Sequence, residues 1–445
     1  PPPAMAALQG VPLRLAQTLG SRLPTAAYEA PLATRKVKCL TLNVLASPVP
    51  FNRMEGERLS CLLRQIEERQ YDVVALQELV ARRWSVVARK KRFDEFVGSL
   101  RELGYVHQLT GPAPRRGAPL DGGIGLFSKH PITASSSHPW ERQVSWDAWA
   151  CKGILRALVE IPPPPGSTKA LGWPPPAPAR LHVLTLHAQA SHVGWQDTAG
   201  EERYRSIRLG QMRQLRDVVR DETGDGEAVL AFGDFNFDAR DLGELALHQA
   251  TLAQGTGRSR PPLDVLSDTF GGEHPVTYGA RRADGGPNET FLTCRRLRTS
   301  EQCLDHVYYW PSEPWAAGYP DAGGLVGLGR GGRRGHVDGR PRCALEVCPY
   351  TGPGSGAGSR PTQVSDHFGW SVELDVAWRQ PVEALRTDAK GCPLPVLTPV
   401  EPHRPPPLPR GQRLGAPPVQ PLKPAGARQL LRRMWHWAQA PLQRP

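Results

Sequence analysis

Apolar residues occur along the chain in short continuous runs and in stripes of helical spacing. Val37–Ala46 and Asp72–Leu76 are almost wholly apolar, which is typical of buried strands. Between them, apolar residues recur at the three- and four-residue spacing of one helix face, at Leu59, Leu62, Leu63 and Ile66. Further strands are predicted at Gly122–Ser128, Ile154–Ile161, Leu181–Leu186, Ala228–Phe232, Leu304–Trp310 and Gly369–Val376, and further helices at Phe93–Leu103 and Glu201–Val219. This irregular alternation predicts packed sheets with helices outside them.

Composition divides the chain into one folded domain and two tails. We predict a folded domain over residues 36–378, an N-terminal tail over 1–35 and a Pro-rich basic tail over 379–445. Within the domain, a Pro-rich stretch near 162–178 and a Gly- and Arg-rich stretch near 319–360 predict loop insertions. The apolar content of 39% allows a sizeable core even if the tails do not fold.

The positive charge is concentrated near the C-terminus. The formal net charge is +12, and residues 401–445 hold eight Lys or Arg and one Glu, which is +7 of that total. A basic excess fits a partner that carries phosphates, either a lipid surface or a nucleic acid; a merely soluble basic tail is the alternative. The same tail contains an apolar helical stripe beside arginines, at Leu430, Leu431, Met434, Trp435 and Ala438. This stripe predicts a helix that lies on anionic lipid or docks on a partner.

Targeting signals and cysteines bear on the compartment. No run of about 18 apolar residues predicts a membrane-spanning helix, and the sequence leaves open an anchor upstream of Pro1. Residues 1–28 hold Arg14 and Arg22 but no acid, which weakly resembles an organellar transit peptide. The eight cysteines form no CxxC pair, and without a visible secretory signal we expect reduced thiols. We therefore favour an intracellular protein that is peripheral to membranes, with organelle targeting as an alternative.

Polar residues with catalytic chemistry stand at the ends of the predicted strands. They are Asn43, Glu78, His187, Asp234, Asn236, Asp305, Asp366 and His367. Active sites in layered sheets are commonly built from residues at strand ends, so these positions can converge. Each position taken alone is more often a surface turn or a solvated strand end. A GDFN run followed much later by SDH, each at a strand end, is a far stronger signal.

The chemistry of this set favours a metal-dependent phosphoryl site. Carboxylates and amides without thiolates favour a hard cation, Mg²⁺, with Mn²⁺ as a substitute. Two imidazoles beside carboxylates suit proton transfer and the stabilisation of charge on a phosphoryl group. The residues alone therefore indicate a metal-assisted reaction at phosphorus.

Six motifs in one order resemble the DNase-I-like endonuclease/exonuclease/phosphatase superfamily. They are TLNV, LQE, LxH, GDFNFD, LDHVYY and SDH, and they extend from Lys36 to Val376. The resemblance implies a four-layered α/β sandwich, in which two packed mixed sheets are flanked by helices. It also implies Mg²⁺-dependent hydrolysis of a phosphodiester or phosphomonoester by an in-line water.

The resemblance implies two groups of metal and base residues. Glu78 matches the principal Mg²⁺ ligand of the family, with Asn43 beside it, and Asp366 is a further metal contact. His367 matches the general base, and Asp305 matches the carboxylate that supports the imidazoles.

The resemblance assigns the remaining motif residues to the phosphate and the attacking water. Asp234 and Asn236 would orient the water and the phosphate, and they also approach the place of a second metal. His187 would donate to the phosphoryl oxygen. His306 stands where family members often carry Tyr or Arg, and we assign it no role.

Two local segments resemble neutral sphingomyelinases in particular. Asp147 and Lys152 lie in a D-x4-K-G segment that implies an Asp–Lys switch, with Lys152 reaching the substrate phosphate. The alternative is an exposed Asp and Lys at the start of a strand. The run His187–Ala190 resembles the THLQA segment of the same branch, with two departures in five residues.

The tryptophans near these segments have two possible roles. Trp140, Trp146 and Trp149 precede Lys152, and Trp310 and Trp315 follow Asp305. Their rings suit a bilayer interface or a choline cation. Core packing is the alternative for each of them.

The sequence therefore predicts a Mg²⁺-dependent phosphodiesterase, with sphingomyelin, cleaved to ceramide and phosphocholine, as the favoured substrate. The alternative is a DNase, RNase or repair-type endonuclease of the same fold. A catalytically silent binding protein is disfavoured because every expected ligand is present.

Overall fold

The computed structural model describes most of the predicted catalytic domain. It describes residues 33–378 except for 47–53, 81–86, 166–176, 192–199, 280–288, 293–299, 313–334, 353–359 and the positions 116, 119, 225, 259 and 290. The predicted transit-like segment, the predicted C-terminal amphipathic helix and Trp315 lie outside the described residues. Among the helices within them, none is long and apolar enough to span a membrane.

Two six-stranded sheets form the centre of the domain. The first sheet has the order β11 (Gly335–Glu346), β12 (Gly369–Trp378), β1 (Ala33–Ala46), β2 (Val73–Leu79), β4 (Ile124–Ser128), β3 (His107–Gly111). The second has the order β5 (Ile132–Pro139), β6 (Gly153–Ile161), β7 (Ala179–His187), β8 (Ala228–Asp234), β10 (Asp305–Trp310), β9 (Leu263–Asp264). The pairs β1–β2 and β7–β8 are parallel and the other pairs are antiparallel, so both sheets are mixed.

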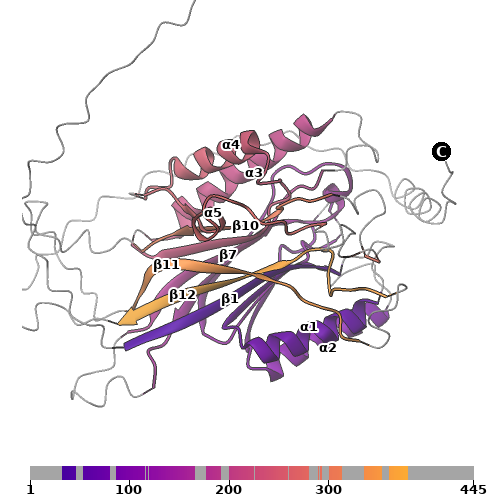
Figure 1. Cartoon of the computed structure of the whole chain (residues 1–445), viewed down its shortest axis with the longest axis horizontal. Helices are drawn as coiled ribbons and strands as arrows, with labels where there is room; N and C mark the ends of the chain where they lie inside the picture. Colours follow the sequence, from indigo (N-terminus) through magenta and orange to yellow (C-terminus); the bar gives the residue numbers. More distant parts are fainter. Residues whose placement is uncertain are drawn as a thin grey trace, which may run out of the picture.

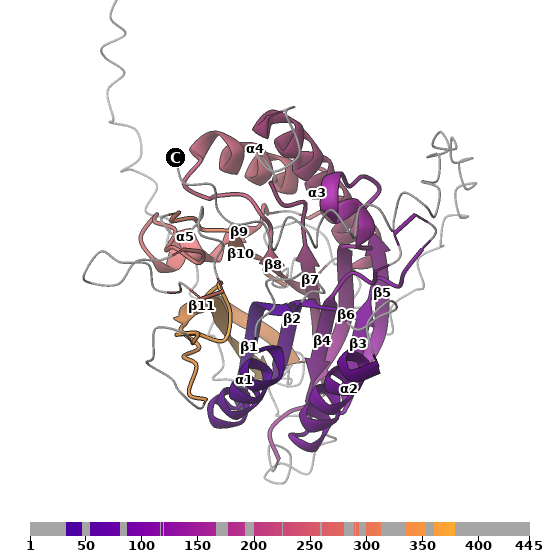
Figure 2. The same cartoon turned by 90° about the vertical axis from the view of Figure 1, so that its right-hand side faces the viewer.

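Helices cover the outer faces of both sheets. Helices α1 (Glu55–Arg69) and α2 (Val87–Glu102) lie outside the first sheet, and α3 (Glu201–Glu222) and α4 (Leu242–Ala253) lie outside the second (Figures 1 and 2). The short helix α5 (Val265–Thr269) and the 3₁₀ turn η1 (Ser145–Trp149) lie in connections. These four layers confirm the predicted α/β sandwich.

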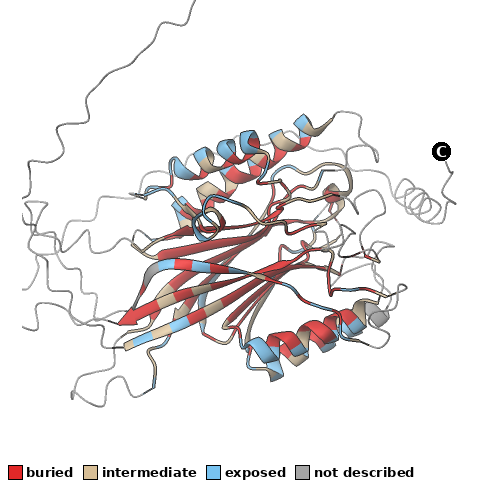
Figure 3. Ribbon diagram, viewed as in Figure 1, coloured by how far each residue is buried: buried red, intermediate tan, exposed pale blue. Residues whose placement is uncertain are grey.

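The apolar runs are explained by burial on both faces of each sheet. On β1, Val37 and Cys39 belong to the core that includes the second sheet, whereas Leu40 and Leu42 pack in the core under α1 and α2. Since successive side chains of a strand alternate between faces, a strand buried on both faces must be apolar throughout. Figure 3 shows the strands buried along most of their length.

The structure adds elements that the sequence pattern did not reveal. The insertion expected near 319–360 was predicted as a loop, but residues Gly335–Glu346 form strand β11 at the edge of the first sheet. The edge strand β5 is rich in serine, so it lacks the apolar run of an inner strand. Helix α4 begins after Asp241, whose carboxylate accepts a hydrogen bond from Glu244 N at 3.2 Å. This Asp-x-x-Glu capping pattern was the available signal for α4.

A buried amide joins the two sheets just beneath their polar ends. Gln77 Nε2 on β2 donates to Thr41 Oγ1 on β1 at 3.1 Å and to Thr185 Oγ1 on β7 at 2.9 Å. All three side chains are at most 1% exposed. Thr41 and Thr185 each lie two residues before a predicted site residue, Asn43 or His187. The hydrogen bonds of Gln77 therefore fix the separation of the sheets directly below the site.

We expect Gln77→Leu to lower the free energy of unfolding by about 1–3 kcal/mol, because two buried threonine hydroxyls lose their amide partner. Urea denaturation followed by circular dichroism measures this change. The control is Gln254→Leu at the exposed end of α4, which should stay within about 0.5 kcal/mol of the unmodified protein. A Gln77→Leu protein as stable as the control would show that the two sheets do not depend on this amide.

Candidate active site

Strand register brings three of the predicted residues into one row of the second sheet. His187 on β7 is the register partner of Asp234 on β8, and Asp234 is the partner of Asp305 on β10. Directly paired residues project from the same face of a sheet, so these three side chains stand next to one another. Each is at most 2% exposed. The strand register therefore brings residues that are far apart in sequence to one place.

The first sheet supplies Asn43 and Glu78 from the opposite side. Asn43 Nδ2 donates to Glu78 Oε1 at 3.1 Å and to Asp234 Oδ2 at 2.9 Å, so one amide connects carboxylates of both sheets. The Asn43 Oδ1 atom accepts from Leu45 N at 3.0 Å. A metal-ligand role for Asn43 therefore requires rotation of this amide, which exchanges Oδ1 for Nδ2 at the carboxylates.

The backbone at Glu78 has an unusual conformation. The side chain of Gln77 faces the second sheet, so regular alternation would turn Glu78 towards the helices. The φ angle of Glu78 is +58°, a left-handed conformation that breaks this alternation. Asn236, in the turn after β8, also has a positive φ, of 54°. Left-handed non-glycine residues cost free energy and are concentrated at functional sites, which agrees with the predicted roles of both.

His367 and Asp305 form a close pair across the two sheets. His367 Nδ1 lies 2.9 Å from Asp305 Oδ2, and His367 Nε2 lies 3.9 Å from Asp234 Oδ2. Burial alone would lower the pKa of His367, but Asp305, Asp234 and Asp366 together raise it to about 10. In this arrangement Nδ1–H donates to Asp305, and Nε2 is the atom that exchanges a proton with the site.

The second histidine has the opposite electrostatic character. Burial, followed by the nearby Lys152 ammonium, holds the pKa of His187 well below its usual value. His187 Nε2 lies 3.5 Å from Asp234 Oδ2 and 4.0 Å from Glu78 Oε1. A neutral imidazole with one N–H suits the predicted role of hydrogen-bond donor to a phosphoryl oxygen.

Burial also changes the acids of the site. Burial is the main cause that raises the pKa of Asp234 to about 7, and Asp305 adds to it. Burial likewise raises the pKa of Asp366, and Glu78 adds to it. Asp234 accepts from Asn236 N at 2.9 Å through its second oxygen. Accumulated negative charge in a buried place thus favours the binding of protons or of a cation.

The donor set fits a divalent cation. Asp234, Asp305 and His367 offer ligand atoms within 4.8 Å of one another, and Asp305 Oδ1 is buried without a hydrogen-bond partner among the described residues. The 2.9 Å contact between His367 and Asp305 is already an ordinary hydrogen bond, so their closeness does not by itself make them ligands. Glu78 and Asp234 accept from the same amide, and their oxygens suit Mg²⁺.

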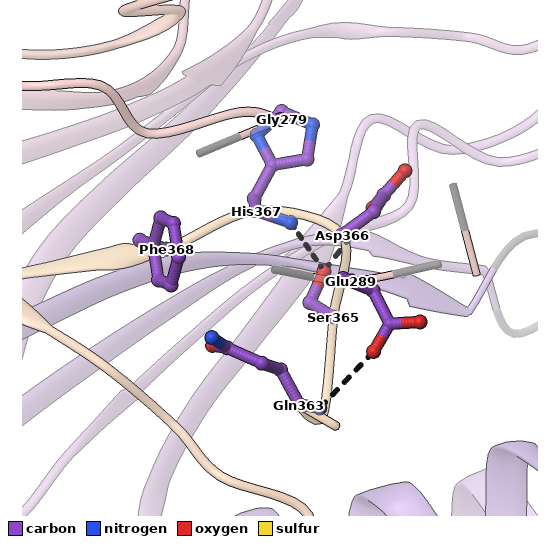
Figure 4. A pocket seen from close by; sticks show the side chains of 7 residues that line it. All are labelled: Gly279, Glu289, Gln363, Ser365, Asp366, His367 and Phe368. Atoms are coloured by element: carbon purple, nitrogen blue, oxygen red, sulfur yellow. Dashed lines mark hydrogen bonds between the residues drawn. The ribbon is translucent and has the colours of Figure 1, made fainter. Parts of the chain in front are cut away.

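Asp366 and His367 follow Ser365 on one loop beside a small cavity. The cavity is lined by Gly279, Glu289, Gln363, Ser365, Asp366, His367 and Phe368 (Figure 4). Ser365 Oγ donates to Asn43 O at 2.6 Å, which ties this loop to β1. Glu289 Oε2 accepts from Gln363 N at 3.1 Å and so binds the start of the same loop (Figure 4).

Asp147 and Lys152 form a buried ion pair beside His187. Lys152 Nζ lies 2.8 Å from Asp147 Oδ1 and 3.3 Å from Ala188 O, and both charged side chains are buried. The alternative of an exposed Asp and Lys is therefore wrong. Asp147 Oδ2 accepts from Gln189 Nε2 at 3.0 Å and from Ala190 N at 2.7 Å. The two segments that resemble sphingomyelinases thus contact each other.

Of the described tryptophans predicted near the site, two lie in the core and two are half-buried. Trp140 and Trp310 are at most 1% exposed, so the bilayer and choline readings are wrong for them. Trp140 Nε1 donates to His187 O at 2.7 Å, which fixes the end of β7. Trp146 and Trp149, in η1, are half-buried. His306 is buried and stacks on Phe237 with ring centroids 4.0 Å apart.

Sequence reasoning missed residues that hold the site together. Arg58 on α1 is buried and donates to Val44 O at 2.9 Å, to Leu45 O at 2.8 Å and to Val364 O. It thereby connects the segment after Asn43 with the segment before Asp366. Arg58 carries no sequence signal, because an arginine in an amphipathic helix reads as part of the solvated face.

The chain is similar to known phosphodiesterase-type proteins. A model of the Endonuclease/Exonuclease/phosphatase family matches residues 40–367. A sphingomyelinase of Dictyostelium discoideum is 29% identical over 240 residues, which are 47% of this chain and 50% of that protein. The chain thus spans about half the length of this curated relative.

Solved structures with a similar arrangement include two bacterial proteins. The beta toxin of Staphylococcus aureus superimposes with a TM-score of 0.48 at 15% identity, over 76% of this chain and 99% of the toxin. Sphingomyelinase C from Streptomyces griseocarneus superimposes with a TM-score of 0.47 at 20% identity, over 76% of this chain and 99% of that protein. A further structure of a beta toxin variant contains bound magnesium ions; its TM-score is 0.46 at 16% identity, over 78% and 100% of the two chains.

The site carboxylates predict a specific response to metal. We expect Glu78→Ala to weaken Mg²⁺ binding at least tenfold, because it removes one of the two carboxylates that meet at Asn43. Isothermal titration with MgCl₂ measures this affinity. Glu95→Ala on α2, whose side chain is 59% exposed, is the matched control and should bind Mg²⁺ like the unmodified protein. If both variants bound Mg²⁺ with equal affinity, Glu78 would not be a ligand of the metal.

The raised pKa of His367 predicts a pH dependence of stability without divalent cations. A histidine whose pKa is about 6.5 when unfolded and about 10 when folded stabilises the protein fully below pH 6.5. This contribution is lost as the pH rises towards 10, with a slope of at most about 1.4 kcal/mol per pH unit.

Urea unfolding in EDTA between pH 6.5 and 8.5 measures this slope. Asp305→Asn should reduce it, because Asp305 is the main group that raises the pKa of His367. Stability that is flat or rises over this interval, or that falls equally steeply in Asp305→Asn, contradicts the electrostatic description of the pair.

Proposed function

Because this chain belongs to the endonuclease/exonuclease/phosphatase family, we propose that it is a divalent-cation-dependent phosphodiesterase that hydrolyses sphingomyelin to ceramide and phosphocholine. The observation that carries the choice of substrate is the buried Asp147–Lys152 pair, which places an ammonium next to His187. The 29% identity to a sphingomyelinase over half its length supports the same choice.

The proposed chemistry begins with activation of a water molecule. His367 Nε2 takes a proton from the water, while Asp305 accepts from Nδ1–H and so stabilises the imidazolium that forms. The oxygen of the water forms a bond to phosphorus as the bond between phosphorus and the ceramide oxygen breaks. The ceramide oxygen takes up a proton from solvent, and His367 returns the proton of the water to solvent, which completes the hydrolysis.

The other site residues orient and stabilise the phosphoryl group. His187 donates its N–H to a phosphoryl oxygen, and Lys152 supplies positive charge beside it. Asp234 and Asn236 direct the water towards phosphorus. Glu78 would hold the divalent cation, with Asn43 or Asp366 beside it. When bound, the cation stabilises charge on the phosphoryl oxygens and offsets the carboxylates that raise the pKa of His367.

The location that we propose follows from the substrate. Sphingomyelin lies in membranes, so the protein would act at a membrane surface, and we infer that it does so inside the cell. All described cysteines are free and buried, which supports a reducing compartment. Nucleic acid is the alternative substrate, because the chain has a net charge of +12 and belongs to a family that includes nucleases.

An assay on two substrate classes tests the proposal. We expect the purified chain with Mg²⁺ to release phosphocholine from sphingomyelin vesicles and to leave plasmid and oligonucleotide intact. EDTA should abolish the release, and His367→Ala should lower kcat at least a thousandfold because the proton acceptor is lost. Lys152→Ala should lower lipid turnover about tenfold or more.

The controls separate the alternatives. Phosphatidylcholine vesicles distinguish recognition of the sphingolipid backbone from recognition of the choline head group alone. Cleavage of nucleic acid without phosphocholine release would establish the nuclease reading in place of ours. Phosphocholine release that survives in His367→Ala would refute the role of this residue while leaving the substrate assignment in place.

A further inference from the structure

The pair of His367 and Asp305 is assembled from two different sheets. Asp305 begins β10 in the second sheet, whereas His367 precedes β12 in the first. Their contact of 2.9 Å joins side chains that are 62 positions apart in the chain. The geometry of the pair therefore depends on whatever fixes these two backbone segments relative to each other.

Thr277 contacts both segments. Its hydroxyl oxygen accepts from Leu304 N at 3.0 Å and from Asp305 N at 3.2 Å. Its carbonyl oxygen accepts from Phe368 N, the residue after His367, at 2.7 Å. The Thr277 side chain is completely buried, so water does not replace these bonds. One residue thus holds the backbone of Asp305 through its side chain and the backbone beside His367 through its main chain.

The neighbours of Thr277 reinforce this connection. Thr277 N and Tyr278 N both donate to Gln302 O, at 2.9 and 3.0 Å, and Gln302 N donates back to Tyr278 O at 3.0 Å. Tyr278 is also bridged to His367 through the backbone, and the two rings lie 5.0 Å apart between centroids. The segment 277–278 therefore lies between the strand of Asp305 and the loop of His367 and is bonded to both.

We propose that Thr277 is a positioning residue that sets the distance and orientation of the His367–Asp305 pair. It touches neither the imidazole nor the carboxylate with its hydroxyl; it acts on the backbone from which both side chains project. Misplacement of a catalytic group by about 1 Å costs about a hundredfold in rate, so a backbone constraint of this kind matters for turnover. The inference rests on the proposed function, because it takes His367 as the base and sphingomyelin as the substrate of the turnover assay.

Two substitutions at Thr277 separate positioning from packing. Thr277→Val keeps the shape but removes the acceptor of two backbone N–H groups, so we expect kcat on sphingomyelin to fall tenfold to a hundredfold, with KM changed less than about twofold. Thr277→Ser keeps the hydroxyl and should retain kcat within about threefold. Thr223→Val is the matched control, since Thr223 is also buried and hydrogen-bonded, but at the C-terminal end of α3. It should turn over like the unmodified protein.

Amide hydrogen exchange gives a measurement that does not depend on activity. In the unmodified protein, the Leu304, Asp305 and Phe368 amides should exchange at least a hundredfold more slowly than unprotected amides. In Thr277→Val, the Leu304 and Asp305 amides should exchange faster, whereas Thr223→Val should leave them unchanged.

Several results would contradict a positioning role for Thr277. Full turnover by Thr277→Val, equal losses in Thr277→Ser and Thr277→Val, or unprotected Leu304 and Asp305 amides in the unmodified protein would each overturn the inference. If Thr277→Val does not fold, Thr277→Ser turnover and the exchange of the unmodified protein decide. An unmodified protein that hydrolyses neither lipid nor nucleic acid would refute the proposed function, while the exchange data would still test the backbone constraint.

Discussion

Mutual repulsion among four neighbouring carboxylates, two of them fully buried, is the constraint around which this structure is organised. The sandwich brings four acids to one end, Glu78, Asp234, Asp305 and Asp366. Their charges would separate the two sheets at this end unless donors lay among them. The amide of Asn43 donates to both Glu78 and Asp234, and the imidazole of His367 lies between Asp305 and Asp234, so both groups reduce this repulsion. The remaining excess of negative charge favours the binding of a cation at this site.

Buried hydrogen bonds hold the site at two levels, one beneath it and one at its own backbone segments. Gln77 joins the sheets in the layer below the candidate site residues, and Thr277 and Arg58 hold the segments from which those residues project. Because these groups are buried, a donor or acceptor left without its partner would cost free energy. The two sheets therefore have one preferred separation. A reaction at phosphorus needs this accuracy, since the attacking oxygen, the phosphorus and the leaving oxygen must lie in line.

The sequence was sufficient for the fold and for the residues with distinctive chemistry. Motifs such as GDFNFD and SDH combine rare side chains with strand ends, and the register of β7, β8 and β10 then places His187, Asp234 and Asp305 side by side. Positioning residues such as Thr277 and Arg58 escaped prediction, because a threonine in a loop or an arginine on a helix has the same local pattern whether it is buried or solvated. The edge strands were not predicted either, because their exposed positions are polar and interrupt the apolar run.

The place of β12 in the first sheet bears on how the protein is made. This last described strand lies between β11 and β1, so the end of the domain is inserted beside its beginning. His367 enters the site directly before β12, and Asn43 stands on β1. A chain still emerging from the ribosome therefore holds Glu78, His187 and Asp234 before it holds His367. The site is therefore completed only when the end of the domain joins the first sheet beside β1, after the other site residues are already present in the chain.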